Sequence, residues 1–228
     1  MTDRLLIFDF DGVVADSEVA ANALLAQAIS AIGHPTTLED CLHHYMGRRW
    51  SDCVLAIEGR IGRPLPPGFE AARRAEMEAH ETELHAVAGV AAFIERFGHL
   101  RRCVASSSAP PYLHRVLAQL GLAHWFGEAV FSGTQVARGK PFPDLFLHAA
   151  ACMGVPPEHC LVIEDSPTGV RAGVAAGMTT LGLCAGAHIR DGHAERLLSA
   201  GAESVAHTYE EAATFVDRWL QRDGSTPA

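Results

Sequence analysis

Two pairs of acidic residues stand where apolar runs of the sequence end. Asp9 and Asp11 close the first run, and Glu164 and Asp165 close another. Because side chains two residues apart leave a strand in the same direction, Asp9 and Asp11 repel one another in a crevice unless a cation or a shared proton lies between them. An acidic surface turn is the alternative, but such a turn needs no apolar run before it. Acid pairs at the ends of two strands therefore predict a site for a hard cation.

Two other segments carry groups that suit an anion. Lys140 is the only lysine among 18 basic residues and lies in a loop with two prolines. We therefore expect Lys140 to occupy a position where a compact ammonium group is required and arginine would not serve. Chance and an ordinary solvated loop are the alternatives. Ser106, Ser107 and Ser108 end a further apolar run, where hydroxyls and open backbone N–H groups could bind an oxyanion. Three serines before a proline are also typical of a plain helix cap.

The periodicity of the chain shows how these groups would be positioned. After Gly89 the sequence alternates between helix and strand, which predicts a doubly wound parallel sheet with helices on both faces, an α/β fold. Before that point it reads as one strand followed by helices only. We expect a core of residues 1–15 and 86–228 and an all-helical insertion of residues 16–85. Expected strands are about 4–10, 102–106, 129–131, 160–164, 179–183 and 204–205. Expected helices are about 18–32, one opened by Thr37 and Asp40, 50–61, 67–84, 89–97, 110–120, 144–153, 168–176, 192–200 and 209–220. Asp16 and Ser17 are candidate N-terminal caps of the helix expected over about 18–32.

Composition excludes several classes of partner. A net charge of −9 argues against nucleic acid and anionic membranes. No apolar run approaches the roughly 20 residues that span a bilayer, and no signal peptide is visible. We expect a cytoplasmic protein, monomeric by default. The six cysteines have no C-x-x-C spacing and lie mostly in apolar runs, which predicts free buried thiols.

Four motifs, in this order and spacing, resemble those of the haloacid dehalogenase (HAD) superfamily, in its phosphatase and phosphomutase branch with a small helical cap of the C1 type. The motifs are Asp9-Phe10-Asp11-Gly12-Val13, the strand-ending Ser106, Lys140 in Gly139-Lys140-Pro141-Phe142-Pro143-Asp144, and Glu164-Asp165-Ser166. The match runs from residue 5 to about residue 185. It implies a Rossmann-like core with the helical insertion as cap. It extends to bacterial sugar phosphatases such as those acting on 6-phosphogluconate.

The resemblance implies a role for each motif residue. Asp9 would attack the phosphoryl group and form an aspartyl phosphate, and Asp11 would act as general acid and base. Mg²⁺ would be held by the side chains of Asp9 and Asp165 and the backbone carbonyl of Asp11, with Glu164 ligating directly or through water. The phosphoryl oxygens would be held by three further groups: the Ser106 hydroxyl, the N–H of Ser107, and Lys140. Ser106 occupies the family position, and which of the three serines donates its hydroxyl stays open.

The sequence separates the activities within this branch. A dehalogenase lacks the second acid, which Asp11 supplies here, and a phosphonatase needs a Schiff-base lysine in the cap, where this chain has none. A β-phosphoglucomutase-like mutase is the main alternative; its cap histidine and arginine correspond to Ala21 and Trp50. A non-catalytic phosphate-ligand-binding protein is the other. We expect a Mg²⁺-dependent phosphatase of small phosphorylated metabolites: sugar, sugar-acid or polyol phosphates.

Residues outside the motifs receive simpler interpretations. Arg48 and Arg49 follow a glycine at the start of a cap helix, so contact with the substrate and surface exposure are both open. Arg73 and Arg74 read as an exposed ion-pair face of a Glu-rich helix. Close packing against the sheet is expected for Gly169, Gly173 and Gly177. Solvated or capping roles are expected for the histidine pairs His43/His44, His80/His85 and His188/His193.

Overall fold

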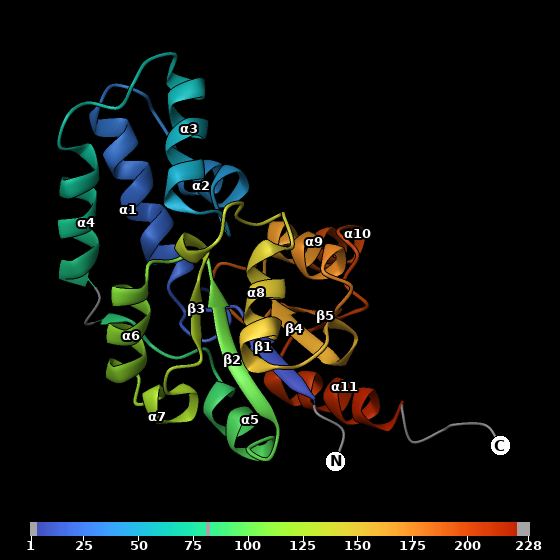
Figure 1. Ribbon diagram of the computed structural model, residues 1–228. Helices are drawn as coiled ribbons and strands as arrows, with labels where there is room; N and C mark the ends of the chain where they lie inside the picture. The colour runs from blue at the N-terminus through green and yellow to red at the C-terminus, as the bar shows by residue number, and fades with distance from the viewer. Residues whose placement is uncertain (1–3, 81–82, 223–228) are drawn as a thin grey trace.

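The computed structural model describes residues 4–80 and 83–222, and its centre is a six-stranded parallel sheet in the order β3-β2-β1-β4-β5-β6 (Figure 1). All four residues of β1 are buried, and Ile7 at its middle lies opposite Cys103 of β2 and Val162 of β4. The strand order reverses on either side of β1, so the predicted doubly wound sheet is confirmed. The strands are β1 (Leu5–Phe8), β2 (Arg101–Ser106), β3 (Val130–Ser132), β4 (Cys160–Glu164), β5 (Thr179–Leu183) and β6 (Ser204–Ala206).

Helices cover both faces of the sheet, each over its own apolar cluster. One cluster contains Phe8, Phe93, Leu113 and Trp219, and the other contains Ile7, Phe146 and Ala172. Alternate residues of β1 thus serve opposite layers, as a strand buried on both faces requires. The first layer is α5 (Val90–Arg96), α6 (Pro110–Gln119), α7 (Ala123–Phe126) and α11 (Tyr209–Gln221); the second is α8 (Asp144–Met153) and α9 (Pro167–Ala175), with α10 (His193–Ser199) beside α9. The sequence did not predict α7, because one helical turn is too short to show a period.

Four helices lie apart from the sheet, at the upper left of Figure 1. They are α1 (Glu18–Ala31), α2 (Leu38–His44), α3 (Trp50–Ile61) and α4 (Phe69–His80). They bury a small apolar cluster of their own, with Ile29, Cys41 and Ile57 at its centre. Thr37 and Asp40 form the capping box that opens α2, as predicted. The fourth helix is shorter than the predicted 67–84, and residues 81–82 lie outside the described part of the chain.

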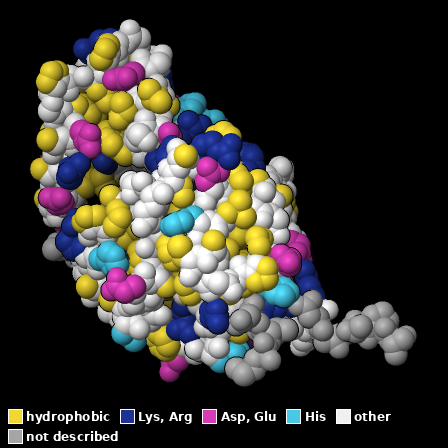
Figure 2. Space-filling view, viewed as in Figure 1, with side chains coloured by type: hydrophobic (Ala, Val, Ile, Leu, Met, Phe, Trp, Pro, Cys, Tyr) yellow, Lys and Arg dark blue, Asp and Glu magenta, His cyan; other side chains and the backbone are white. Residues whose placement is uncertain are grey.

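The two segments that join these helices to the sheet run side by side. Asp16 N donates to His85 O at 2.9 Å, and Val87 N donates to Val14 O at 2.9 Å. This pairing fixes where the chain leaves the end of β1 for α1 and where it returns toward α5. In the space-filling view, basic side chains recur along the border between the four helices and the sheet (Figure 2).

Within the described residues no helix has the length and apolarity needed to cross a bilayer. The cysteines of that part are all free thiols, and only Cys152 is exposed, which matches the prediction of unpaired and mostly buried cysteines.

Candidate active site

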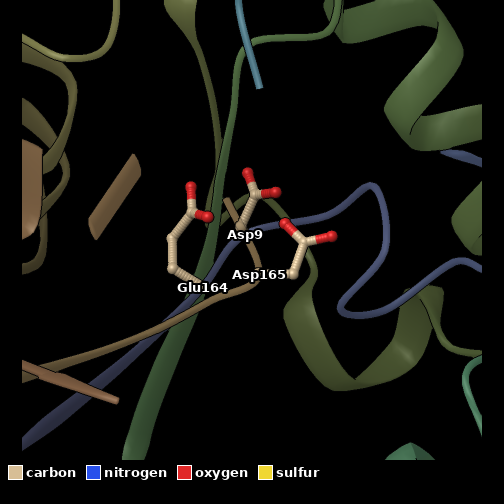
Figure 3. Close-up of side chains that lie close together, drawn as sticks. All are labelled: Asp9, Glu164 and Asp165. Carbon is tan, nitrogen blue, oxygen red and sulfur yellow. The ribbon is translucent and has the colours of Figure 1, made fainter. Parts of the chain in front are cut away.

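Three carboxylates meet at the carboxyl end of the sheet. Asp9 follows β1, Glu164 ends β4, and Asp165 comes next in the chain. One oxygen from each lies within 4.8 Å of the others, and all three side chains are buried. Figure 3 shows them standing side by side at the same end of the strands. Backbone pairing fixes the first, since Asp9 N donates to Ile163 O at 3.0 Å.

Lys140 reaches the same cluster from the loop before α8. Its Nζ donates to Asp9 Oδ1 at 2.6 Å and to Glu164 Oε1 at 2.8 Å, with all three side chains almost fully buried. Burial by itself would lower the pKa of Lys140, but the two carboxylates outweigh it and raise that pKa. The lysine is therefore a fixed positive charge at the centre of the acids.

Asp165 presents an oxygen that the protein leaves unsatisfied. Its Oδ2 is buried and has no hydrogen-bond partner among the described residues. His188 Nε2 lies 2.9 Å away, but it is not oriented to form a hydrogen bond, so it too stays unsatisfied within that part of the chain. Gly12 faces the same oxygen with φ +79°, and a Cβ at that position would overlap Asp165 Oδ2. Glycine at this position leaves the backbone clear of a buried carboxylate oxygen that has no hydrogen-bond partner among the described residues.

The charge balance of the cluster favours a cation. Burial, followed by the neighbouring carboxylates, raises the pKa of Asp165 well above its usual value. Burial also raises the pKa of Asp9, against the pull of Lys140. Three buried carboxylates and one ammonium leave negative charge in a desolvated space, and oxygen ligands of this kind suit a hard divalent cation. The residues present thus fit a metal site.

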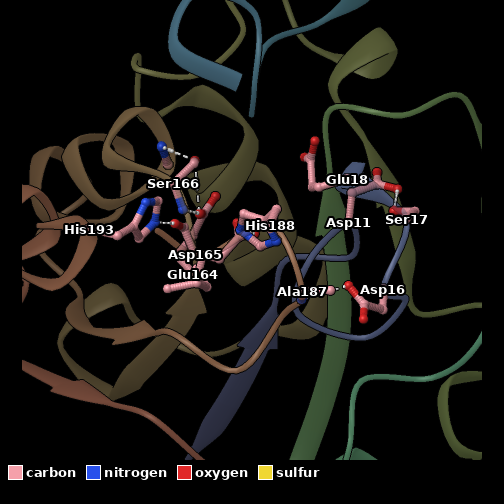
Figure 4. A network of polar contacts seen from close by, with 12 residues as sticks. Asp11, Asp16, Ser17, Glu18, Glu164, Asp165, Ser166, Ala187, His188 and His193 are labelled. Carbon is pink, nitrogen blue, oxygen red and sulfur yellow. Dashed lines mark hydrogen bonds and ion pairs between the residues drawn. The ribbon is translucent and has the colours of Figure 1, made fainter. Parts of the chain in front are cut away.

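Asp11 turns away from this cluster and accepts hydrogen bonds from hydroxyl groups. Ser17 Oγ and Tyr112 Oη donate to Oδ1 at 2.7 and 3.0 Å, and Ser108 Oγ donates to Oδ2 at 2.6 Å. Ser106 Oγ is 3.4 Å from Oδ2. The expectation that the Ser17 side chain caps α1 is wrong: among the described residues it makes no cap hydrogen bond and serves Asp11 instead (Figure 4).

The three serines at the end of β2 have different partners. Ser106 Oγ accepts from Ser108 N at 3.0 Å, while Ser107 Oγ donates to Gly47 O at 3.0 Å and so connects this loop to the helical insertion. These serines were predicted from the sequence, but Tyr112 as a donor to Asp11 was not. Its only signal was a position on the first turn of the helix that follows them.

A cavity of about 730 Å³ lies between this edge of the sheet and the four helices. Asp9, Asp11 and the three serines line its floor, and Glu18 lines it from α1. Glu18 is buried and accepts from Asn22 Nδ2 at 2.6 Å, and burial raises its pKa. The sequence analysis missed Glu18, because an acid in the first turn of a helix is common and needs no function to explain it.

The arginines of the insertion take different positions. Arg48 is exposed and lines the cavity. Arg49 pairs with Asp52 at 3.0 Å and donates to three backbone carbonyls of residues 133–137 in the sheet domain, at 3.2 to 3.4 Å. Arg74 forms the expected exposed pair with Glu70. The same expectation is wrong for Arg73, which is partly buried in the cavity wall over the Trp50 ring, because α4 packs its Arg73 face inward.

Two further expectations need correction. His188, in the loop after β5, and His193, the first residue of α10, are buried, not solvated. They lie on either side of Asp165 (Figure 4), and His193 Nε2 donates to Asp165 O at 2.6 Å. Gly169 and Gly173 pack closely against Glu164 and Thr180, as expected, and a Cβ on Gly169 would overlap Glu164 Oε1. The expectation is wrong for Gly177, because a Cβ there would meet nothing within 4 Å; this glycine has φ +73° in the turn after α9.

Comparison with known proteins agrees with this geometry. The chain is 29% identical over 185 residues to 6-phosphogluconate phosphatase of Escherichia coli (strain K12), covering 80% of this chain and 83% of that protein. It is 28% identical over 187 residues to fructose-1-phosphate phosphatase of the same organism, covering 76% and 92%. A conserved haloacid dehalogenase-like protein of unknown function from Agrobacterium tumefaciens str. C58 has a similar structure, with a TM-score of 0.82 and 30% identity over 96% of this chain and 100% of the other. A haloacid dehalogenase-like hydrolase profile matches residues 4–177, and the chain belongs to that family of enzymes.

Proposed function

We propose that the protein is a Mg²⁺-dependent phosphatase of small phosphorylated metabolites, namely sugar, sugar-acid or polyol phosphates. The observation that carries this proposal is the position of Asp9. It stands at the open end of the central strand, with Oδ1 held by Lys140, beside the unsatisfied oxygen of Asp165 and facing the cavity. Relatives named as phosphatases of 6-phosphogluconate and fructose 1-phosphate support the substrate class.

The chemistry proposed for Asp9 and Asp11 is the one that the resemblance to the family implies, and their contacts are compatible with it. With Oδ1 engaged by Lys140, Oδ2 of Asp9 attacks phosphorus, the bond from phosphorus to the leaving oxygen breaks, and Asp11 gives that oxygen a proton. Asp11 then takes a proton from water, whose oxygen attacks the aspartyl phosphate, releasing inorganic phosphate and free Asp9. The hydroxyls of Ser17, Ser108 and Tyr112 hold the Asp11 carboxyl in place.

Asp9, Glu164, Asp165 and the backbone carbonyl of Asp11 would hold the Mg²⁺ ion, which supplies positive charge beside the phosphoryl group when bound. Lys140 offers a second positive charge to the same group, together with the Ser106 hydroxyl and the Ser107 N–H. We assign residues 16–85 to a cap over a core of residues 1–15 and 86–228, and we expect a cytoplasmic monomer. Closure of that cap would exclude water from the leaving-group side.

The test is release of inorganic phosphate from a panel of sugar, sugar-acid and polyol phosphates, with p-nitrophenyl phosphate as a substrate without a sugar, in the presence and absence of Mg²⁺. We expect Mg²⁺-dependent turnover. Conversion of β-glucose 1-phosphate to glucose 6-phosphate without phosphate release would favour a mutase. Ala21 lines the cavity at the position where a mutase has its cap histidine, and it cannot supply a proton. Binding of these compounds without any turnover would leave a non-catalytic binding protein.

A further inference from the structure

Arg73, on α4, is a cation in the cavity wall that forms no ion pair with any described residue. Its guanidinium carbon lies 3.8 Å from the centroid of the Trp50 ring, and Nη1 contacts Met77 Sδ at 2.6 Å. Nε is buried and has no hydrogen-bond partner among the described residues. Over residues 4–80 and 83–222, no carboxylate forms an ion pair with Arg73.

This arrangement is costly unless something compensates it. A guanidinium carries five N–H donors, and a thioether sulfur is a weak acceptor. Burial lowers the pKa of Arg73, which reflects the loss of water around the charge. Stacking on Trp50 holds the plane of the group and recovers part of the cost, but it satisfies none of the donors. An anion entering the cavity would supply the negative charge and the hydrogen-bond acceptors that the described residues do not offer to Arg73.

The other arginines near the cavity show that Arg73 differs from them. Arg49 is occupied by Asp52 and the carbonyls of the sheet domain, and Arg74 is occupied by Glu70. Arg48 is free of ion pairs within the described part of the chain and lines the same cavity. Arg48, Arg73 and Cys53 line the same cavity; burial raises the pKa of Cys53 to about 12, and the charges of the two arginines oppose that rise.

We propose that Arg73, supported by Arg48, forms a subsite for a second anionic group of the substrate. The proposal rests on the phosphatase function proposed above and narrows its substrate class. The substrate is a phosphate monoester whose far end carries a carboxylate or a second phosphate, which the planar guanidinium binds through paired hydrogen bonds. The phosphate to be cleaved lies on the floor against Asp9, and the second anion lies on the cap wall. A cavity of about 730 Å³ accommodates a sugar chain between them.

The experiment uses matched substrates that differ only in this second anion. Gluconate 6-phosphate and glucitol 6-phosphate have the same carbon chain, ending in a carboxylate or a hydroxymethyl group. Fructose 1,6-bisphosphate and fructose 6-phosphate test a phosphate in its place. We expect kcat/KM of the wild type to favour the more anionic member of at least one pair by about 10- to 100-fold, as for a charge-assisted contact.

Variants then locate the contact. Arg73→Gln should reduce the preference to about threefold or less, and Arg73→Lys should retain part of it because a charge remains. Arg63→Gln is the control: it removes an exposed arginine of the cap that lies outside the cavity, and the preference should persist. Binding of the same pairs to the Asp9→Asn protein, measured by calorimetry, should show the same preference without turnover and lose it when Arg73→Gln is added.

The outcomes separate this subsite from the phosphatase function. Turnover of p-nitrophenyl phosphate with no preference within either pair, or a preference that survives in Arg73→Gln, would overturn the subsite and leave the phosphatase function standing. Absence of turnover on every phosphate ester would refute the phosphatase function. The calorimetric comparison would then still decide whether Arg73 binds an anion. If Arg73→Gln does not fold, the wild-type preference and its partial retention in Arg73→Lys decide.

Discussion

The side chain of Arg49, from the helical insertion, lies across Gly139 in the loop that carries Lys140. A Cβ at Gly139 would come within 2.8 Å of Arg49 Cδ and would overlap Arg49 Nε. The guanidinium beyond this contact donates to Gly133 O, Val136 O and Ala137 O. The absence of a side chain at Gly139 therefore gives the insertion a direct contact with the loop that positions Lys140.

Gly139→Ala should displace Arg49 and weaken this contact. We expect kcat/KM to fall about 10-fold on every substrate, since the loss of two or three hydrogen bonds corresponds to roughly 1 to 3 kcal/mol. Arg49→Ala should show the same uniform loss, also on p-nitrophenyl phosphate. In the Arg49→Ala background, Gly139→Ala should cost little. Gly59→Ala is the control, because a Cβ there meets nothing within 4 Å. An equal fall in kcat/KM on Gly139→Ala in the wild-type and Arg49→Ala backgrounds would show that the effect does not act through Arg49.

Asp9→Asn should abolish turnover and leave the protein folded. The change keeps the shape of the side chain and removes the attacking anion, so we expect a loss of at least about 1,000-fold in kcat. It also removes one of three buried like charges and leaves Lys140 paired with Glu164, so the protein should stay folded. Phosphate release and circular dichroism measure the two effects, with the exposed Asp191→Asn as control. Near-normal activity in folded Asp9→Asn protein would reject Asp9 as nucleophile.

Mg²⁺ should stabilise the protein through the acidic cluster. At about 100 times its dissociation constant, a ligand of the native state contributes about 2.7 kcal/mol, which for a chain of this size is roughly 5 to 10 °C in Tm. Asp165→Asn removes the charge of the carboxylate whose oxygen is unsatisfied, so the rise in Tm on adding Mg²⁺ should be smaller in this variant. The rise should persist in Glu158→Gln, which changes an exposed residue. Choline chloride at equal ionic strength excludes general screening. The same increment in Asp165→Asn and wild type would place the metal elsewhere.

Lys140→Met should destabilise the metal-free protein by about 3 to 5 kcal/mol, because removal of one member of a buried ion pair leaves the others uncompensated. Asp9 and Glu164 are the groups left behind. Mg²⁺ should recover part of the loss, since it supplies the missing positive charge. The exposed pair of Arg138 and Asp144, in the same loop, provides the control: Arg138→Met should cost much less. Urea denaturation with and without Mg²⁺ measures both, and similar costs for the two variants would contradict the burial argument.

Asp40 should give the cap a stability that depends on pH. Hydrogen bonds from the backbone and side chain of Thr37 lower the pKa of Asp40 to about 2. Because the folded pKa lies below the ordinary value of about 3.9, the contribution is complete above that value and is lost as the pH falls toward 2. The difference in stability between wild type and Asp40→Asn should thus be constant from pH 7 to 5 and narrow below pH 4. Urea midpoints across this range test it, and a difference independent of pH would be inconsistent with an ionised cap.

The sequence alone determined the sheet and the residues at its carboxyl edge. Asp9, Lys140, Glu164 and Asp165 were predicted to meet because each follows an apolar run or a constrained loop, and parallel strands end at one edge of a sheet. Such patterns are local: a few consecutive residues carry the whole signal. The capping box of Thr37 and Asp40 was predictable for the same reason.

Only the tertiary structure decided which side chains surround that edge. Ser17 reaches Asp11 from the start of α1, and Ser108 and Tyr112 reach it from the start of α6, about 100 positions along the chain, a contact that no local pattern predicts. Arg73 and His188 were read as solvated, since a polar residue on a helix or in a loop looks exposed until another element covers it. Whether such a residue is buried depends on how α4 packs on Trp50 and how the loop after β5 packs against Asp165. Those contacts join residues more than 20 positions apart, a distance over which a periodic pattern carries no information.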